Sequence, residues 1–414
     1  DSFMETGSVA FMLISTAMVF FMTPGLAFFY GGLGRRKNVI STMMMSIVPI
    51  GIAILMWIIV GYSLSFSGNH LLIGDFGASF LKGVSETSST KGYEIPDMLF
   101  AVYQMMFSII TVAIATGSIV GRMRFNPLVI WIPLWLLLVY YPLAHMVWGG
   151  GLLAQMGALD FAGGNVVHIS SGVAGLVLAL MVGKRYDYDR IAYRPHNVPF
   201  VLLGTAILSF GWIGFNAGSA LSANSSAVHA LLTTVVSAAA GMLSWLFIEK
   251  AVNSKPSLVG ASTGLVAGLV AITPGAGYVS VGSALIVGAL VSPVCYFAIS
   301  VLKKRFDYDD ALDAFGCHGV GGIFGGLMTA LLTRPDLTPE AGNVGLFFGS
   351  SHLFIATIAA IFLTLIWSGG VTWLILFIIK KFQPLRVSER QEVRGLDDSE
   401  HEETAYPTFL GLDT

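Results

Sequence analysis

Residues 160–168, Asp-Phe-Ala-Gly-Gly-Asn-Val-Val-His, place an acid and a histidine at the start of a long apolar run. A second stretch, Phe-Gly-Cys-His-Gly at 315–319, places another histidine just inside an apolar run. Hydrocarbon disfavours an ionisable side chain by at least about 2–3 kcal/mol at the bilayer centre, so such a group inside a membrane span indicates a function. Each histidine is followed sixteen residues later by a basic residue, Lys184 and Arg334. That spacing fits one membrane-length helix and predicts two equivalent spans.

The composition is that of a polytopic membrane protein. Of 414 residues, 55% are hydrophobic and 11% are charged, whereas soluble domains average about 25% charged residues. The net charge of -2 implies no nucleic-acid partner. The two cysteines, Cys295 and Cys317, both lie in apolar runs, which argues against a disulfide framework. The sequence begins with Asp1, and we expect that its start has been trimmed.

Eleven apolar runs are long enough to cross a bilayer and predict an all-α fold with eleven transmembrane helices. They lie at 7–31, 39–66, 97–121, 126–142, 163–183, 197–219, 225–249, 256–274, 277–302, 312–333 and 348–379. Five spans in each half, 7–183 and 197–333, predict an inverted repeat with its site near the midplane, and 348–379 adds a long final helix. We therefore expect a transmembrane domain, 1–379, followed by a cytoplasmic tail, 380–414.

Basic residues predict the orientation. With the N-terminus outside, all but three of the 22 Lys and Arg residues fall in inside segments, the exceptions being Lys82, Lys91 and Arg334. Because cytoplasmic loops are enriched in Lys and Arg, we expect an outside N-terminus and a cytoplasmic C-terminus. The tail is acidic near its end and carries Arg-Gly-Leu-Asp at 394–397. It is either a solvated, partly disordered segment or a docking surface for a cytoplasmic regulator.

Two of the eight histidines, His168 and His318, are candidates for chemistry. Alone, either would be interpreted as a structural hydrogen-bonding group, but equivalent positions in an inverted repeat bring the two together and predict a pore-lining pair. A zinc site needs three or four protein ligands, and the sequence has no HExxH motif, carboxylate cluster or phosphate loop. We therefore predict no metal site, no cofactor and no enzyme. Asp160 is interpreted first as a helix cap and second as an attractor of cations, with Asp313 in the corresponding place before His318.

Four aromatic residues lie near the predicted outer ends of the spans that flank the histidines. They are Tyr103, Phe107, Trp148 and Phe215. A desolvated aromatic cage attracts a cation by about 2 kcal/mol. Ordinary core packing is the alternative for each of them.

Four stretches together resemble the family of ammonium transporters, methylammonium permeases and Rhesus proteins, most closely its prokaryotic ammonium transporters. They are 160–168, Phe-Gly-Cys-His-Gly-Val-Gly-Gly at 315–322, Ala-His-Met-Val-Trp-Gly-Gly-Gly at 144–151, and Gly-Trp-Ile-Gly-Phe-Asn-Ala-Gly-Ser at 211–219. The resemblance covers nearly the whole chain. It implies a homotrimer in the cytoplasmic membrane with one pore per subunit, and a tail that communicates with a PII-type regulator.

The resemblance also implies a role for each candidate residue. Trp148 and Ser219 would form the outer ammonium site, with Tyr103 and Phe107 beside it and Asp160 supporting it. Phe107 and Phe215 would be the gate below that site. His168 and His318 would line the pore. Cys317 stands where many relatives have a small apolar residue, and we expect no effect on transport.

The predicted function is ammonium transport across the bilayer, with methylammonium as an analogue. Ammonium would be recruited at the outer site and deprotonated, and ammonia would pass the two histidines, which would relay the proton. An ammonium sensor acting through a cytoplasmic partner is the alternative. A membrane enzyme with a histidine metal site is a third class, which would predict stoichiometric metal in the purified protein.

Overall fold

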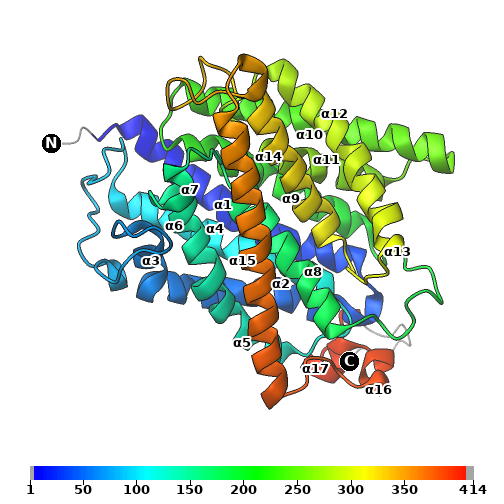
Figure 1. Ribbon diagram of the computed structural model, residues 1–414. Coiled ribbons are helices and arrows are strands. Elements are labelled where there is room, and N and C mark those ends of the chain that lie inside the picture. The colour runs from blue at the N-terminus through cyan, green and yellow to red at the C-terminus, as the bar shows by residue number, and fades with distance from the viewer. Residues whose placement is uncertain (1–3, 407–414) are drawn as a thin grey trace.

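The structure is a computed structural model that describes residues 4–406. Residues 1–3 and 407–414, the latter including the end of the predicted tail, lie outside the described part. All regular elements of residues 4–406 are helical, which confirms the all-α prediction (Figure 1). Within that range, ten helices are long and apolar enough to cross a membrane, and the shorter apolar helix Leu258–Ile272 occupies the predicted eighth run, 256–274. The count of eleven spans stays a prediction.

The helical elements follow one another in the order of the predicted runs. They are α1 (Thr6–Leu33), η1 (Arg36–Asn38), α2 (Val39–Met56), η2 (Trp57–Gly61), α3 (Tyr62–Phe66), η3 (Ser79–Leu81), α4 (Asp97–Ala115), η4 (Thr116–Ile119), α5 (Phe125–Trp135), η5 (Leu136–Tyr140), α6 (Tyr141–Trp148), α7 (Leu152–Gln155), η6 (Gly164–Ile169), α8 (Ser170–Val182), α9 (Val198–Ala217), η7 (Gly218–Ala220), α10 (Ser225–Asn253), α11 (Leu258–Ile272), α12 (Val281–Phe297), η8 (Ala298–Leu302), α13 (Lys303–Arg305), η9 (Phe315–Gly319), α14 (Val320–Leu332), η10 (Leu346–Phe348), α15 (His352–Phe382), α16 (Glu389–Arg394) and α17 (Leu396–His401).

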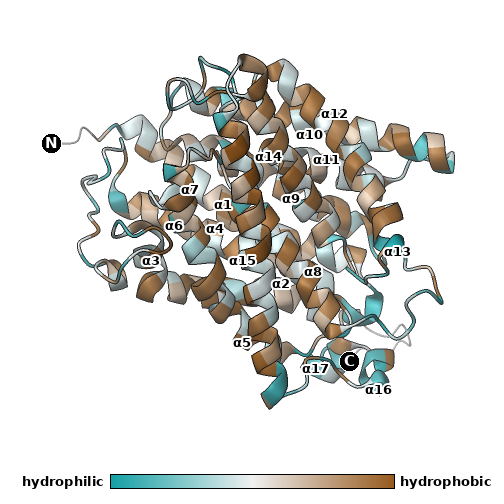
Figure 2. Cartoon of the chain, in the orientation of Figure 1, coloured by the Kyte–Doolittle hydropathy of each residue, from teal (hydrophilic) through white to brown (hydrophobic). Residues whose placement is uncertain are grey.

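The outer surface of the helix bundle is apolar. Large side chains such as Phe247 and Ile366 are 74% and 70% exposed, and Figure 2 shows hydrophobic residues along the long helices and hydrophilic ones in the loops and tail. In water such exposure would be unfavourable, whereas lipid solvates it. The chain is therefore a multi-pass membrane protein. We call the side where α1 begins the N-terminal face and the side of α16 and α17 the tail face.

The predicted fourth span, 126–142, was too short, because the helix continues through α6 to Trp148. Pro142 lacks an N–H group and cannot satisfy the carbonyl four residues earlier, that of Leu138. The helix widens to π geometry over η5, and the indole Nε1 of Trp367 on α15 donates to the Leu138 carbonyl at 2.8 Å. A proline at the end of the predicted run is thus accommodated within one continuous span.

The two halves of the transmembrane domain cross at glycines. The first helices of the halves, α1 and α9, pack along one another, and α8 contacts η9 while α14 reciprocally contacts η6. A Cβ atom on Gly172 would lie 2.3 Å from the backbone nitrogen of Gly319, and one on Gly322 would lie 2.9 Å from the Gly164 carbonyl. This reciprocal close approach is what an inverted repeat predicts, and only small residues permit it.

The tail is docked on its own chain rather than solvated. Figure 1 shows α16 and α17 gathered at the lower end of α15. Leu396 and Asp397 are 0% and 4% exposed, and the Asp397 carboxylate accepts the Ser41 N–H at 2.8 Å at the start of α2. Gly395 has φ +109, and a Cβ there would lie 2.7 Å from Lys37 Cβ, so a larger residue is excluded. Through residue 406, the interpretation as a disordered segment was therefore wrong.

Candidate functional site

The first histidine span begins at a carboxylate cap. Asp160 Oδ1 accepts the backbone N–H groups of Gly163 and Gly164 at 3.0 and 2.6 Å. Its Oδ2 accepts those of Asn165 and Val166 at 2.9 and 3.1 Å. The carboxylate thus pairs the N–H groups that a helix start leaves without partners. These bonds fit the first interpretation of Asp160, as a cap.

The second histidine span begins at Asp310, not at Asp313 as the sequence had suggested. Asp310 accepts the N–H groups of Ala314 and Phe315 at 3.1 and 2.8 Å. Asp313 instead pairs with Lys303 at 2.9 Å. The signal was present in the sequence, because Asp160 and Asp310 each precede their histidine by eight residues.

The two histidines are in direct contact in the interior. Nδ1 of His168 lies 2.9 Å from Nδ1 of His318, the ring centroids are 5.0 Å apart, and the side chains are 1% and 4% exposed. A hydrogen bond between two Nδ1 atoms requires one imidazole to donate and the other to accept. The pair therefore holds at least one proton between its two rings.

Trp212 on α9 orients the first histidine, a role that the sequence analysis missed. Its ring stacks on that of His168 with centroids 5.3 Å apart and 12° between planes, and its Nε1 donates to Thr273 Oγ1 at 3.0 Å. Among the described residues, Nε2 of His168 has no hydrogen-bond partner. A stacking partner cannot be recognised from spacing, because Trp212 comes from the other half of the chain.

Aromatic side chains cover the histidines on the N-terminal side. Phe107 on α4 and Phe215 on α9 stack with ring centroids 4.2 Å apart and 7° between planes, and both are fully buried. Trp148, at the end of α6, meets Phe107 edge-on at 5.9 Å. Phe215 lies 6.0 Å from the His168 ring. The sequence-predicted aromatics therefore form one continuous column that ends on the histidine pair.

Tyr103 and Ser219 lie together at the end of this column that is nearer the N-terminal face. The Tyr103 hydroxyl is 3.4 Å from Ser219 Oγ and lies 2.8 and 2.9 Å from the carbonyl oxygens of Gly214 and Phe215, to which it can donate. The Tyr103 side chain is fully buried, whereas Ser219 is partly exposed. Tyr103 therefore touches the column from α4 and braces the end of α9, and Ser219 has the more accessible hydroxyl.

Trp148 is tied to the cap of the first histidine span. Its indole Nε1 donates to the backbone carbonyl of Asp160 at 2.8 Å. Since all four N–H bonds of the Asp160 carboxylate point into the helix start, this residue contacts the aromatic column through its backbone. The structure brings together every residue that the sequence assigned to the site.

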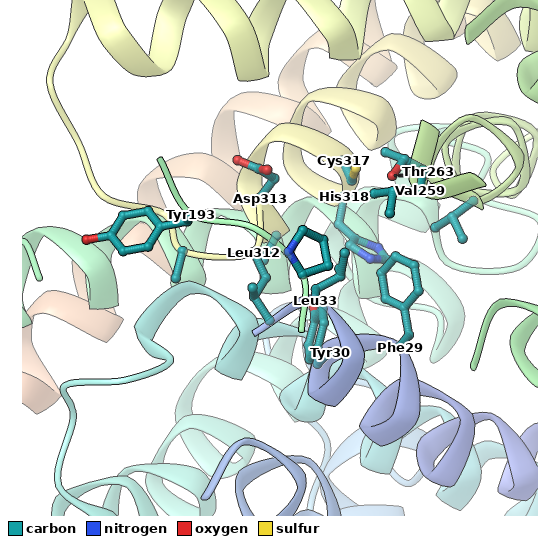
Figure 3. Close-up of a pocket in the computed structure, with 14 residues that line it drawn as sticks. Phe29, Tyr30, Leu33, Tyr193, Val259, Thr263, Leu312, Asp313, Cys317 and His318 are labelled. Atoms are coloured by element: carbon teal, nitrogen blue, oxygen red, sulfur yellow. Dashed lines mark hydrogen bonds between the residues drawn. The ribbon is translucent and has the colours of Figure 1, made fainter. Parts of the chain in front are cut away.

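The space on the two sides of the histidine pair differs. Beside both histidines, and reaching up to Phe215, lies a cavity of about 10 Å³ that is bounded mostly by apolar side chains. On the tail side, His318 opens into a cavity of about 200 Å³. Figure 3 shows His318 pointing toward Phe29 in this cavity, with Asp313 and Tyr193 farther along. The cavity beside the pair is thus narrow and the one on the tail side is wider; both are lined mostly by apolar side chains, and the wider one also includes Asp313, Tyr193 and Thr263.

A buried ion cluster lies beside the wide cavity at the tail face. The Arg185 guanidinium donates to both oxygens of Asp309, at 2.9 and 2.6 Å, and the fully buried Arg122 lies 4.0 Å away. Burial would raise the pKa of Asp309, but the hydrogen bonds and charge of Arg185 and the charge of Arg122 lower it to about 2. Asp309 is therefore ionised at neutral pH.

These features define a helical membrane protein with a buried histidine pair beneath stacked aromatic rings. The model of the Ammonium Transporter Family matches residues 10–406. The ammonium transporter of Bacillus subtilis strain 168 is 46% identical over 403 residues, covering 97% of this chain and 99% of that protein. Ammonium transporter Amt1 of Archaeoglobus fulgidus is 43% identical over 406 residues, covering 97% and 100%. The chain belongs to the Ammonium Transporter Family, which confirms the resemblance.

Solved structures agree with this assignment. The crystal structure of Candida albicans Mep2 superposes with a TM-score of 0.88 at 33% identity, covering 94% of this chain and 88% of that chain. A structure titled Sensor Amt Protein superposes with a TM-score of 0.88 at 29% identity, covering 96% and 98%. Both support the helical membrane fold over nearly the full length.

Proposed function

We propose that this protein transports ammonium across the cytoplasmic membrane by passing neutral ammonia along the histidine pair. The observation that carries the proposal is the 2.9 Å contact between His168 and His318 directly beneath the stacked Phe107 and Phe215. We assign the N-terminal face to the outside, because the basic residues then gather on the cytoplasmic side. The family and the names of its relatives support ammonium as the substrate.

Recruitment takes place at the outer end of the aromatic column. Trp148, Phe107 and Tyr103 offer ring faces, and Ser219 offers a hydroxyl oxygen that accepts an N–H of ammonium. Asp160 contributes by holding Trp148 through its backbone carbonyl. Cation–π contacts of about 2 kcal/mol each replace part of the water that the ion gives up.

The ion cannot continue unchanged past the Phe107–Phe215 gate. Moving a bare charge into a low-dielectric passage costs on the order of tens of kcal/mol in the idealised limit, and a few cation–π contacts return only a small part of this. Ammonium can lose a proton and become neutral, whereas potassium cannot. The apolar space of about 10 Å³ beside the histidines therefore selects for ammonia.

The proton has a defined route. An N–H bond of ammonium breaks, its electron pair stays on nitrogen, and Nε2 of His168, which has no partner among the described residues, accepts the proton. His168 then passes its Nδ1 proton to Nδ1 of His318, which releases its Nε2 proton into the wide cavity. Ammonia crosses separately and takes up a proton on the cytoplasmic side. Mutual repulsion of two buried imidazolium ions keeps the pair from holding two extra protons.

Methylammonium uptake into proteoliposomes tests the function. We expect saturable uptake into vesicles that contain the purified protein, inhibited by ammonium and not by equal potassium. Uptake equal to that of protein-free vesicles would refute transport.

A sensor that acts through a cytoplasmic partner is the second candidate. The docked tail favours it, because Leu396 and Asp397 tie the chain end to the start of α2, beside the cytoplasmic mouth. The likeness to the structure titled Sensor Amt Protein also favours it. Assembly as a homotrimer and binding of a PII-type regulator remain predictions; the apolar perimeter of the bundle and the docked tail are compatible with them. A sensor would bind ammonium but give no uptake in the vesicle experiment.

A further inference from the structure

A carboxylate at the outer face ties three separate segments together. Glu94, which precedes α4, accepts hydrogen bonds from the hydroxyl groups of Ser222 and Ser8, the latter at 2.7 Å. The Ser8 oxygen in turn accepts the backbone N–H of Ala223 at 3.0 Å. Ser8 and Ser222 are 0% and 8% exposed, while Glu94 is exposed. We call Glu94, Ser8 and Ser222 the Glu94 clamp.

The clamp adds side-chain hydrogen bonds to a turn that a backbone bond also closes, from the Leu221 N–H to the Gly218 carbonyl at 2.9 Å. After α9 and η7, Leu221 has φ +58, a left-handed conformation that a side chain such as leucine rarely adopts. The next two residues are held by hydrogen bonds of the clamp. Glu94 accepts the Ser222 hydroxyl, and the Ser8 oxygen accepts the Ala223 N–H. Asn224 then caps α10 by accepting the Ala227 N–H at 3.1 Å. Because the strained residue lies directly before the clamped residues, the clamp compensates for its unfavourable geometry.

The same turn carries Ser219 of the outer site. Ser219 Oγ donates to the Phe215 carbonyl at 2.8 Å, which fixes the hydroxyl relative to the end of α9. Below the turn, Gly218 packs on Tyr103, where an added Cβ would lie 2.6 Å from the tyrosine hydroxyl. The turn is therefore fixed from below by α4 and from above by the clamp.

We propose that Glu94 is a positioning residue for ammonium recruitment: through Ser8 and Ser222 it holds the turn that presents the Ser219 hydroxyl to the ion. The proposal rests on the proposed function, because it assumes that Ser219 contacts ammonium. Glu94 itself does not need to touch the ion. The clamp joins the start of α1, the segment before α4 and the α9–α10 turn, so it orders the mouth where both halves of the chain meet.

Attraction of cations by the Glu94 charge is the rival explanation, and one substitution separates the two. Glu94→Gln removes the charge, but its amide oxygen can still accept both hydroxyls. Glu94→Ala removes both the charge and the clamp. Ser222→Ala keeps the charge and breaks one arm of the clamp. Glu86→Ala removes an exposed carboxylate from the same outer loop and serves as the matched control.

The test is the concentration dependence of ammonium-evoked current in proteoliposomes, measured at low and high salt. For Glu94→Ala and Ser222→Ala we expect the half-saturating ammonium concentration to rise about fivefold with the maximal current retained. Glu94→Gln and Glu86→Ala should stay close to the parent protein. Charge attraction predicts a different result. If Glu94→Gln and Glu94→Ala raise the half-saturating concentration equally, and both shifts disappear at high salt, the positioning role is overturned in favour of charge attraction.

A double-mutant cycle asks whether the clamp acts through Ser219. If it does, Glu94→Ala shifts the half-saturating concentration less in a Ser219→Ala background than in the parent protein. Independent shifts of equal size would contradict the proposal.

Thermal unfolding of each purified variant controls for folding, and Ser222→Ala keeps the test decisive if Glu94→Ala is unstable. Two further variants separate failure of the outer site from failure of the clamp. If Trp148→Leu and Ser219→Ala leave the half-saturating concentration unchanged, the proposed outer site is wrong. If these two variants raise it and the clamp variants do not, only the clamp proposal fails.

Discussion

The stretches that end in His168 and His318 are built alike but surrounded differently. In both, an aspartate eight residues before the histidine caps a π-helical start, and glycines let the two starts cross. The first histidine lies beneath the stacked rings, and both histidines line an apolar cavity of about 10 Å³. The second histidine also lines a wider cavity of about 200 Å³. The two similar helix starts thus bring the imidazoles together, while the space around the two rings differs.

The largest expected effect comes from breaking the pair on either side. His168→Leu and His318→Leu should each reduce methylammonium uptake about a hundredfold or more, because positioned proton transfer contributes at least about that factor. The two losses should be similar, since the contact needs both rings. Full uptake by one variant would mean that the two histidines do not act as a unit.

A smaller effect is expected on the stability of the protein at acidic pH. It concerns the residue before each capping aspartate, which is Leu159 in the first stretch and Asp309 in the second. Since the pKa of Asp309 is lowered to about 2 in the folded chain, against about 3.9 when unfolded, its stabilisation is complete above about pH 4 and is lost as pH falls toward 2. The full contribution is on the order of 2–3 kcal/mol. Thermal unfolding of detergent-purified protein should show this loss on acidification.

Asp309→Asn is the matched variant for that experiment. It should lower the melting temperature at neutral pH and flatten the acid dependence between pH 4 and 2. An unchanged acid dependence would show that other carboxylates control it.

The next smaller effect is on the half-saturating ammonium concentration. Aromatic residues on the two sides of the Phe107–Phe215 stack should affect it differently. Trp148→Leu should raise the half-saturating ammonium concentration about tenfold, because about 1–2 kcal/mol of cation–π attraction is lost. Phe29→Leu should leave that concentration nearly unchanged, since Phe29 lines the two cavities beyond Phe215 and not the outer aromatic column. Ammonium-evoked currents measure both. Equal shifts would contradict recruitment of ammonium at Trp148.

The smallest expected effect is a difference between the two caps. Asp160 accepts four backbone N–H groups and Asp310 accepts those of Ala314 and Phe315. Asp160→Asn should therefore destabilise the protein about 1 kcal/mol more than Asp310→Asn. Thermal unfolding of the two variants under identical conditions checks the order, and a larger loss for Asp310→Asn would reverse it.

The features that the sequence predicted well are those with local signals. Apolar runs marked the helices, and two histidines at equivalent places of a repeat were expected to meet, as they do at 2.9 Å. The error at Asp313 came from choosing the acid nearest to the histidine. The cap is Asp310, and Asp313 has φ +60 and pairs with Lys303.

The features that escaped prediction depend on contacts between distant segments. The predicted fourth span stopped at Pro142, and Trp367, more than two hundred residues later, donates to the Leu138 carbonyl that this proline cannot pair with. The stacking of Trp212 on His168 and the docking of Leu396 under α2 likewise join distant parts of the chain. Composition made the tail look solvated, because its buried residues are few and lie among charges.

The most direct measurement is the current that ammonium and potassium evoke from proteoliposomes on a solid-supported membrane, with the parent protein and with His168→Leu/His318→Leu. We predict an ammonium current and no potassium current for the parent protein, and loss of the ammonium current in the double variant. A double variant that keeps the current of the parent protein and still excludes potassium would contradict a passage that works through the histidine pair.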